Sequence, residues 1–270
     1  MDDGATLRVT GVRALPDPFV RVEAEVVRGA LDLRGTPDEA VVLHVPLPGG
    51  GRDETGRWYT IRRISPDGRA VTFDVVTHAG GVGAGWARRG AVGDELVASR
   101  SARWFRRPDR AAWQVLVGDA AGIPAIARVV EESPRDLRTD VVVEVHEQDG
   151  PAPLPAGTHA RTVVADVGSS RPEEIVSGLH LPDGPGYLFV VGEAAATRRV
   201  RKHLRHERGM STEQYTVVGY WSLDAERQRA RYRANQDRFT AAWADAEAAG
   251  GDDEDVLDRY ERTLTEAGLL

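Results

Sequence analysis

The sequence contains no cysteine, and this absence excludes several kinds of chemistry at once. Without thiols the chain has no disulfide, no thiolate nucleophile, no iron–sulfur cluster and no cysteine-ligated zinc. Lysine is almost absent too, because Lys202 is the only one among 35 basic residues. A lysine Schiff base is therefore excluded at every other position, and the basic side chains are arginines, whose planar donors suit phosphate and carboxylate groups.

Positive charge is also in deficit, since 42 acidic residues against 35 basic ones give a net charge of −7. This balance disfavours nucleic-acid binding, which requires a basic surface. No apolar run approaches the ~18 residues of a membrane span, and the N-terminal Met-Asp-Asp-Gly lacks a secretory pattern. We therefore expect a cytoplasmic protein without nucleic-acid or membrane partners, and the sequence does not predict its oligomeric state.

Motifs for several common chemistries are missing as well. The chain has no Gly-x-Ser-x-Gly elbow, no Walker loop and no His-Glu-x-x-His motif. His44, His146, His159 and His180 are scattered without the spacing of metal ligands. His203 and His206, at i and i+3, could bind a metal, but only Glu207 is near them, so we expect no metal site.

Three successive patterns divide the chain. Between Leu7 and Leu96, short runs that alternate apolar and polar residues are separated by turn sequences, which is typical of a small antiparallel barrel. The clearest runs are residues 19–26, 40–46, 58–62 and 70–77.

From about residue 112 the pattern changes to buried strands that alternate with helices, which predicts a parallel α/β sheet. The expected strands are 113–117, 141–145, 162–165, 187–191 and 215–219, and the expected helices are 124–132, 171–179 and 194–208. After residue 223 only helix signals remain, at 224–249 and 252–267. We therefore predict a β-barrel domain over 1–110, an α/β domain over 111–222 and a helical extension over 223–270.

The most informative short segment of the barrel is residues 57–62, Arg-Trp-Tyr-Thr-Ile-Arg. On a strand, Arg57, Tyr59 and Ile61 share one face, and Thr60 and Arg62 share the other. An arginine can pair with a diphosphate, a tyrosine ring can stack on a flat heterocycle, and a threonine can bond its ring atoms. The same pattern is also typical of an ordinary half-buried strand.

A glycine-rich turn follows at residues 78–87 and leads into a short helix. Exposed amides at a helix start bind anions, although a plain loop explains the glycines equally well.

A strongly basic helix is expected around residues 198–208, which hold six basic residues and one acidic residue. It is suited to phosphates or an anionic ligand, and it is equally typical of a solvated helix surface.

Taken together, these segments resemble the siderophore-interacting protein family, whose members are FAD-containing ferric-siderophore reductases related to ferredoxin–NADP reductases. The matching residues of the first part are Arg57, Tyr59, Thr60, Arg62, His78, Gly81–Ala84, Trp86, Ala87, Gly93, Asp94 and Leu96. Those of the second part are Gly118, Asp119, Pro124–Ile126, Gly192–Ala194, Arg198, Arg201, Leu204, Glu207, Gly209 and Gly219–Trp221.

The resemblance implies a barrel that binds FAD and an α/β domain that binds NADPH or NADH, with a ferric siderophore as the substrate. The implied FAD-binding residues are Arg57, Tyr59, Thr60, Arg62, Thr77, His78, Gly81, Val82, Gly83, Ala84, Trp86, Tyr220 and Trp221. The implied nicotinamide-nucleotide residues are Gly118, Asp119, Ala120, Gly192, Glu193 and Arg198, and those for the substrate are Arg201 and Lys202. The flavin performs the chemistry, so no catalytic side chain and no protein metal ligand are expected.

The chain departs from the family pattern at four places. Gly81-Val82-Gly83-Ala84 replaces Gly-Pro-Ala-Ser, one residue is missing between His78 and Trp86, and Ser99-Arg100 replaces Gly-Pro. Most important for activity, Ala120-Ala121 replaces Glu-Thr where the nicotinamide nucleotide would approach. Two alternatives to a reductase therefore stay open: a family member recruited to another role with little or no use of NAD(P)H, and a binding protein that uses its acidic helical tail.

Overall fold

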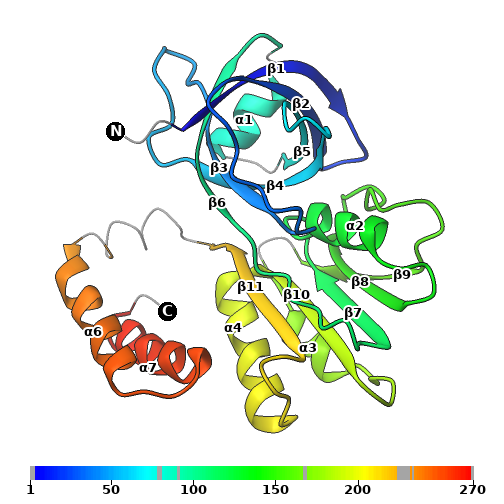
Figure 1. Cartoon of the computed structure of the whole chain (residues 1–270), viewed down its shortest axis with the longest axis vertical. Coiled ribbons are helices and arrows are strands. Elements are labelled where there is room, and N and C mark those ends of the chain that lie inside the picture. Colours follow the sequence, from blue (N-terminus) through cyan, green and yellow to red (C-terminus); the bar gives the residue numbers. More distant parts are fainter. Residues whose placement is uncertain are drawn as a thin grey trace.

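The computed structural model describes residues 4–77, 81–89, 92–166, 169–223, 232 and 234–268. The N-terminal part is a closed antiparallel barrel with the strand order β1-β2-β5-β4-β3-β6 (Figure 1). Its elements are β1 (Ala5–Ala14), β2 (Phe19–Arg28), β3 (Ala40–His44), β4 (Arg57–Ile64), β5 (Ala70–Val76), α1 (Val82–Arg88) and β6 (Glu95–Ala102). The sequence pattern predicts four of these strands and does not resolve β1 and β6, but the expected barrel is confirmed.

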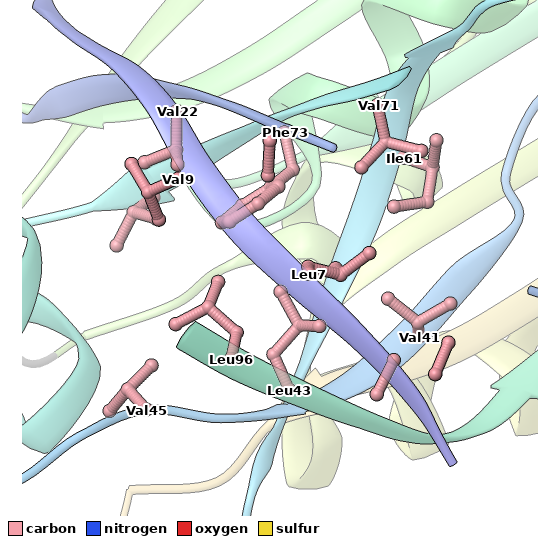
Figure 2. Packing of buried hydrophobic residues seen from close by; sticks show 14 of the residues in the cluster. Leu7, Val9, Val22, Val41, Leu43, Val45, Ile61, Val71, Phe73 and Leu96 are labelled. Carbon is pink, nitrogen blue, oxygen red and sulfur yellow. The ribbon is translucent and has the colours of Figure 1, made fainter. Parts of the chain in front are cut away.

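Alternate side chains of the barrel strands point inward and form one apolar cluster (Figure 2). Burial of each such side chain contributes about 1.5–3 kcal/mol relative to exposure. Helix α1 packs on this cluster through Trp86 and Ala87. The members that are completely buried are Leu7, Val22, Leu43, Ile61, Phe73 and Leu96.

The second part is a parallel sheet with the strand order β11-β10-β7-β8-β9. Its strands are β7 (Trp113–Gly118), β8 (Arg138–His146), β9 (Ala160–Ala165), β10 (Gly186–Glu193) and β11 (Tyr215–Trp221). Helix α2 (Ile123–Glu132) covers one face. The helices α3 (Pro172–Ser177) and α4 (Ala194–Lys202), with the π-helical turn η1 (His203–Glu207), cover the other. All residues of β10 are buried, as expected for a central strand covered on both faces.

The chain order reverses between β7 and β10. Strand β7 pairs with β8, which follows it in the chain, and with β10, which comes much later. In open parallel sheets, ligands bind outside the carboxyl ends of the strands at such a switch point.

The barrel and the sheet are joined through α2 and β4. Arg128 on α2 donates from Nη1 to the carbonyl oxygen of Ile61, at 2.8 Å. Arg62 on β4 pairs through Nη2 with Glu131 Oε1, at 2.9 Å. Phe19 of the barrel also belongs to the apolar cluster under α2, so both polar and apolar contacts fix the junction.

The C-terminal helices α6 (Gln236–Ala248) and α7 (Asp253–Glu266) form a hairpin (Figure 1). Of the helix expected over 224–249, the part before residue 232 lies outside the described residues, and α6 begins at Gln236. Helix α7 starts with a capping box between Asp252 and Asp255. Within the described ranges, the hairpin supplies no member of the three apolar clusters, and no helix is long and apolar enough to cross a membrane.

Candidate functional site at the barrel–sheet junction

Strand β4 carries the Arg-x-Tyr-Thr-x-Arg segment past the end of the sheet. Tyr59 and Ile61 pack on the barrel cluster, and Tyr59 contacts Phe73 with ring centroids 5.6 Å apart. Arg62, on the opposite face, contacts the sheet domain through Glu131. The alternation expected from the sequence therefore holds from Tyr59 to Arg62, and a register shift between Ile61 and Arg63 ends it.

The Tyr59 hydroxyl lies against the first turn of α1. A Cβ atom built on Gly83 would lie 2.0 Å from Tyr59 Oη, so only glycine allows this approach. Burial raises the pKa of Tyr59 to about 12, and the phenol is therefore neutral at physiological pH. Gly81, the N-cap of α1, provides no side-chain cap, and Val82, Gly83 and Ala84 form the first turn.

Arg57 points toward solvent beside Asp53 and is held there. Its Nη1 donates to Asp53 Oδ2 at 2.7 Å, and 28% of its side chain is exposed. This pair orients the guanidinium while leaving donors free for a further anion. Sequence reasoning missed Asp53, although a carboxylate four residues before a candidate arginine is a visible signal.

Two other candidates for FAD binding are held inside the barrel domain. Thr77 donates from Oγ1 to Pro18 O at 3.0 Å. Trp86 is 1% exposed and donates from Nε1 to Asp94 Oδ2 at 2.8 Å. The structure thus places Trp86 in the barrel core, and His78 lies outside the described residues.

Arg62 is buried at the domain junction. In addition to Glu131, its Nε lies 3.6 Å from Asp74 Oδ2. The guanidinium is therefore engaged by two carboxylates, one from each domain. Its evident structural contribution is to hold β4 against α2.

Thr60 and Tyr220 meet where β4 passes the end of β11. Thr60 is buried, and Tyr220 Oη lies near its side chain without a hydrogen bond of good geometry within the described chain. Burial raises the pKa of Tyr220 well above its usual value. A buried, unsatisfied hydroxyl is costly, and such groups mark places where a ligand or water is bound.

The Tyr220 ring stands at one end of a row of aromatic rings that also contains Trp104 and Trp58. Trp104 lies 5.8 Å from Tyr220 and 5.8 Å from Trp58, measured between ring centroids. Asp38 holds the backbone at Trp104, since its Oδ2 accepts from the amides of Trp104 and Phe105 at 2.7 and 2.8 Å. Sequence reasoning missed this row because its members come from three distant segments.

Asp119 occupies the switch point at the carboxyl end of β7. Its Oδ1 accepts from the amides of Ala121 and Gly122, at 2.9 and 3.3 Å, just before α2 begins. Its Oδ2 accepts from Trp221 Nε1 at 2.7 Å. A Cβ on Gly192, at the end of β10, would lie 2.8 Å from the same Oδ2, so the carboxylate extends across to the neighbouring strand.

Burial raises the pKa of Asp119 from 3.8 to about 6. The hydrogen bonds from Trp221 and from the two amides oppose this shift, and the carboxylate of Glu144 on β8 adds to it. The amides at the start of α2, which would otherwise face a ligand, are bonded to this internal carboxylate.

The remaining candidates for the nicotinamide nucleotide have local structural contacts. Gly118 has no room for a side chain, since a Cβ there would meet Ile126 Cδ1 at 2.8 Å. Ala120 packs on the cluster under α2. Glu193 caps α4 by accepting from the amide of Ala196 at 2.8 Å. Arg198 is half-buried, and this burial lowers its pKa.

The two substrate candidates on α4 have different surroundings. Arg201 is 6% exposed and lies within 2.6 to 3.8 Å of Glu261, Glu254 and Asp258 on α7. Lys202, the next residue, is exposed. Helix α7 therefore covers the part of the basic helix that contains Arg201.

The basic turn beyond α4 is also covered. Arg205 pairs with Asp252 at 2.9 Å and with Asp255 at 2.6 Å, and His206 lies 3.3 Å from Asp258. The sequence left two interpretations of this helix open, phosphate recognition or a solvated surface. The structure shows a third arrangement, in which the basic helix forms ion pairs with the acidic residues of α7 and its N-cap.

The junction fits FAD by two observations. The first amides of α1 lack a side-chain cap, and Tyr220 Oη lies unsatisfied beside Thr60. A nicotinamide nucleotide fits less well, because the amides before α2 that could bind its phosphate already donate to Asp119. Within the described ranges, no group of three histidine or carboxylate side chains could hold a metal ion.

Two family models match this chain, one in the barrel part and one in the sheet part. A family model described as siderophore-interacting FAD-binding domain matches residues 38–100, and a model described as siderophore-interacting protein matches residues 111–224. A solved siderophore utilization protein from T. fusca is 28% identical with a TM-score of 0.67, over 80% of this chain and 92% of that one.

Two curated relatives are similar to this chain over about two thirds of its length. The mycobactin import ATP-binding/permease protein IrtA of Mycolicibacterium thermoresistibile is 31% identical over 184 residues, which are 66% of this chain and 20% of that protein. The ferric vibriobactin reductase ViuB of Vibrio cholerae is 26% identical over 185 residues, which are 66% of this chain and 65% of that protein. The chain thus spans about a fifth of the first relative and less than two thirds of the second.

Proposed function

The chain belongs to the siderophore-interacting protein family, and we propose that it is a flavin oxidoreductase that passes electrons from NAD(P)H through FAD to a ferric siderophore. For each nucleotide oxidised, two electrons reduce two ferric ions and one proton is released. Reduction to Fe(II) weakens the complex, because hard oxygen ligands prefer Fe(III).

The observation that carries this proposal is the meeting of Thr60 and Tyr220. Thr60 lies on the strand that would hold the flavin, and Tyr220 lies at the carboxyl end of the sheet that would hold the nucleotide. A cofactor beside these two residues is within reach of ligands from both domains, and this is what transfer between two bound molecules requires.

The side chains of the junction would bind and orient the cofactor. Arg57, oriented by Asp53, would pair with the diphosphate, and the amides of the α1 turn at Gly83 would bond it. Tyr59 and Tyr220 would border the ring system, with Thr60 as a hydrogen-bond partner. FAD, when bound, supplies the ability to accept a hydride and release electrons singly.

The visible spectrum of the purified protein tests the proposal. We expect a flavin spectrum, bleaching by NADH or NADPH without oxygen, and recovery of colour with Fe(II) formation when a ferric chelate is added. Thr60→Val should slow these steps, whereas Thr162→Val, on an exposed position of β9, should not. Protein that stays colourless after incubation with FAD would refute the proposal.

Asp119 favours a second candidate, a flavoprotein of this family that receives its electrons from a source other than NAD(P)H. The carboxylate occupies the amides before α2 and repels a phosphate there. In that case dithionite would bleach the bound flavin and neither NADH nor NADPH would do so.

A further inference from the structure

Trp58 is an exposed aromatic residue inside the motif strand. Its side chain points away from the barrel core, and 39% of the residue is exposed. It pairs across the sheet with Val42 on β3. An indole on the surface loses the stabilisation of burial, and exposed apolar groups mark binding sites where they form a continuous patch, as Trp58 does with Trp104.

A bulge in β6 brings Arg100 to the same place. Val41 pairs with Ser101 and Leu43 pairs with Ala98, so both Ser99 and Arg100 lie opposite Val42. Such bulges redirect side chains. The guanidinium of Arg100 lies over the Trp58 ring, with Cζ 5.8 Å from its centroid.

The charge of Arg100 is not neutralised within the described part of the chain. The residue is exposed, and no carboxylate there forms an ion pair with it. Arg57, which comes directly before Trp58, contrasts with it because Asp53 holds its guanidinium. Trp58 and Arg100 therefore form an aromatic and cationic surface, named here the Trp58–Arg100 platform.

The platform is continuous with the junction. Trp104 contacts Trp58 edge-on, and Tyr220 contacts Trp104 and lies near Thr60. A ligand on the platform would therefore be separated from Thr60 only by this short row of rings. That is the position that an electron acceptor of the junction requires.

We propose that the Trp58–Arg100 platform binds a phenolate or catecholate ring of the ferric chelate, and so selects aromatic chelates over aliphatic hydroxamates. The inference rests on the proposed function for the role of the chelate, but the binding itself is independent of electron transfer. The indole provides a face for the ring, and the guanidinium provides donors for its negatively charged oxygens. An aliphatic hydroxamate offers neither a ring nor a phenolate.

Gallium(III) chelates test the platform without reduction, because Ga(III) resembles Fe(III) and accepts no electron under these conditions. Calorimetry would compare a hexadentate tris-catecholate gallium chelate with a hexadentate tris-hydroxamate one on the full chain carrying FAD. We expect tighter binding of the catecholate. Trp58→Ala and Arg100→Ala should each raise its Kd about tenfold and leave the hydroxamate Kd within about twofold.

Two control variants remove a tryptophan and an arginine that lie elsewhere on the surface. Trp243→Ala removes a tryptophan of the same 39% exposure that contacts Tyr260 on the C-terminal hairpin. Arg161→Ala removes an exposed arginine from β9, at the edge of the sheet. Both should bind the catecholate chelate as the parent chain does.

The outcomes distinguish a failure of chelate binding at the platform from a failure of the proposed reductase activity. Loss of the catecholate preference in Trp58→Ala, with the flavin spectrum unchanged, supports the platform even if the chain reduces no ferric chelate. If Trp58→Ala keeps the preference, weakens both chelates equally or loses FAD, the platform does not select aromatic chelates and the proposal is overturned. A parent chain with no preference overturns it as well.

Discussion

Replacement of Asp119 by asparagine should change how the stability of the chain depends on pH. The carboxylate lies partly buried at the switch point, bonded by two amides and by Trp221. Asparagine keeps an oxygen for the amides but presents its NH2 group to the Trp221 indole N–H, so one hydrogen bond is lost and the titrating group disappears.

The size of the effect follows from the pKa shift from 3.8 to about 6. A carboxyl group with a raised pKa binds its proton more tightly in the folded chain than in the unfolded chain. The free energy of unfolding therefore falls as the pH rises through this range, and the loss is complete above the folded pKa. The shift corresponds to about 3 kcal/mol in total, of which about 2 kcal/mol falls between about pH 4.5 and about pH 7.5.

Urea unfolding of both proteins, followed by tryptophan fluorescence, measures this quantity. At each pH the free energy of the parent chain is subtracted from that of Asp119→Asn, which cancels the other titrating groups. We expect the difference to increase by about 2 kcal/mol in favour of the variant from about pH 4.5 to about pH 7.5. A difference that does not change with pH would show that Asp119 has an ordinary pKa.

Two further substitutions test other contacts. Gly83→Ala brings a Cβ to 2.0 Å from Tyr59 Oη and should weaken FAD binding about tenfold, as measured by fluorescence titration; unchanged affinity would show that α1 does not contact the cofactor. Glu261→Gln removes one charge beside the buried Arg201 and should destabilise the contact by about 1–3 kcal/mol. Faster hydrogen exchange in α7 would report this, with the exposed Glu266→Gln as control; equal exchange in both variants would show that the ion pair does not hold the helix.

The fold was predictable because its signals are local. Alternation along β2 and β5 and the succession of buried strands and helices after residue 112 depend on neighbouring residues, and these segments form the expected barrel and parallel sheet. The strand face of Tyr59 was predictable for the same reason. By contrast, β1 alternates only over the short stretch from Leu7 to Thr10, because its pairing with β2 shifts register between Thr6 and Leu7 and between Val9 and Gly11.

The surroundings of individual site residues were not predictable, because they depend on segments far along the chain. Arg62 is bonded to Glu131, 69 residues later, and no spacing near either residue indicates this contact. Trp86 matches a family motif, yet its indole packs in the barrel core and bonds Asp94. A motif residue can therefore support the shape of a site without touching its ligand.

The ion pairs of the C-terminal hairpin change where an anionic ligand would find positive charge. The sequence places most of its clustered basic residues on the helix at 198–208, but α7 supplies carboxylates to Arg201 and Arg205 there. An anion at that surface would have to displace these partners. On the barrel side, Arg100 is exposed and, in the part of the chain that the structure describes, has no carboxylate beside it. Positive charge for an anionic chelate is therefore available beside β4 at Arg100, whereas on the basic helix Arg201 and Arg205 are already paired and Lys202 is exposed.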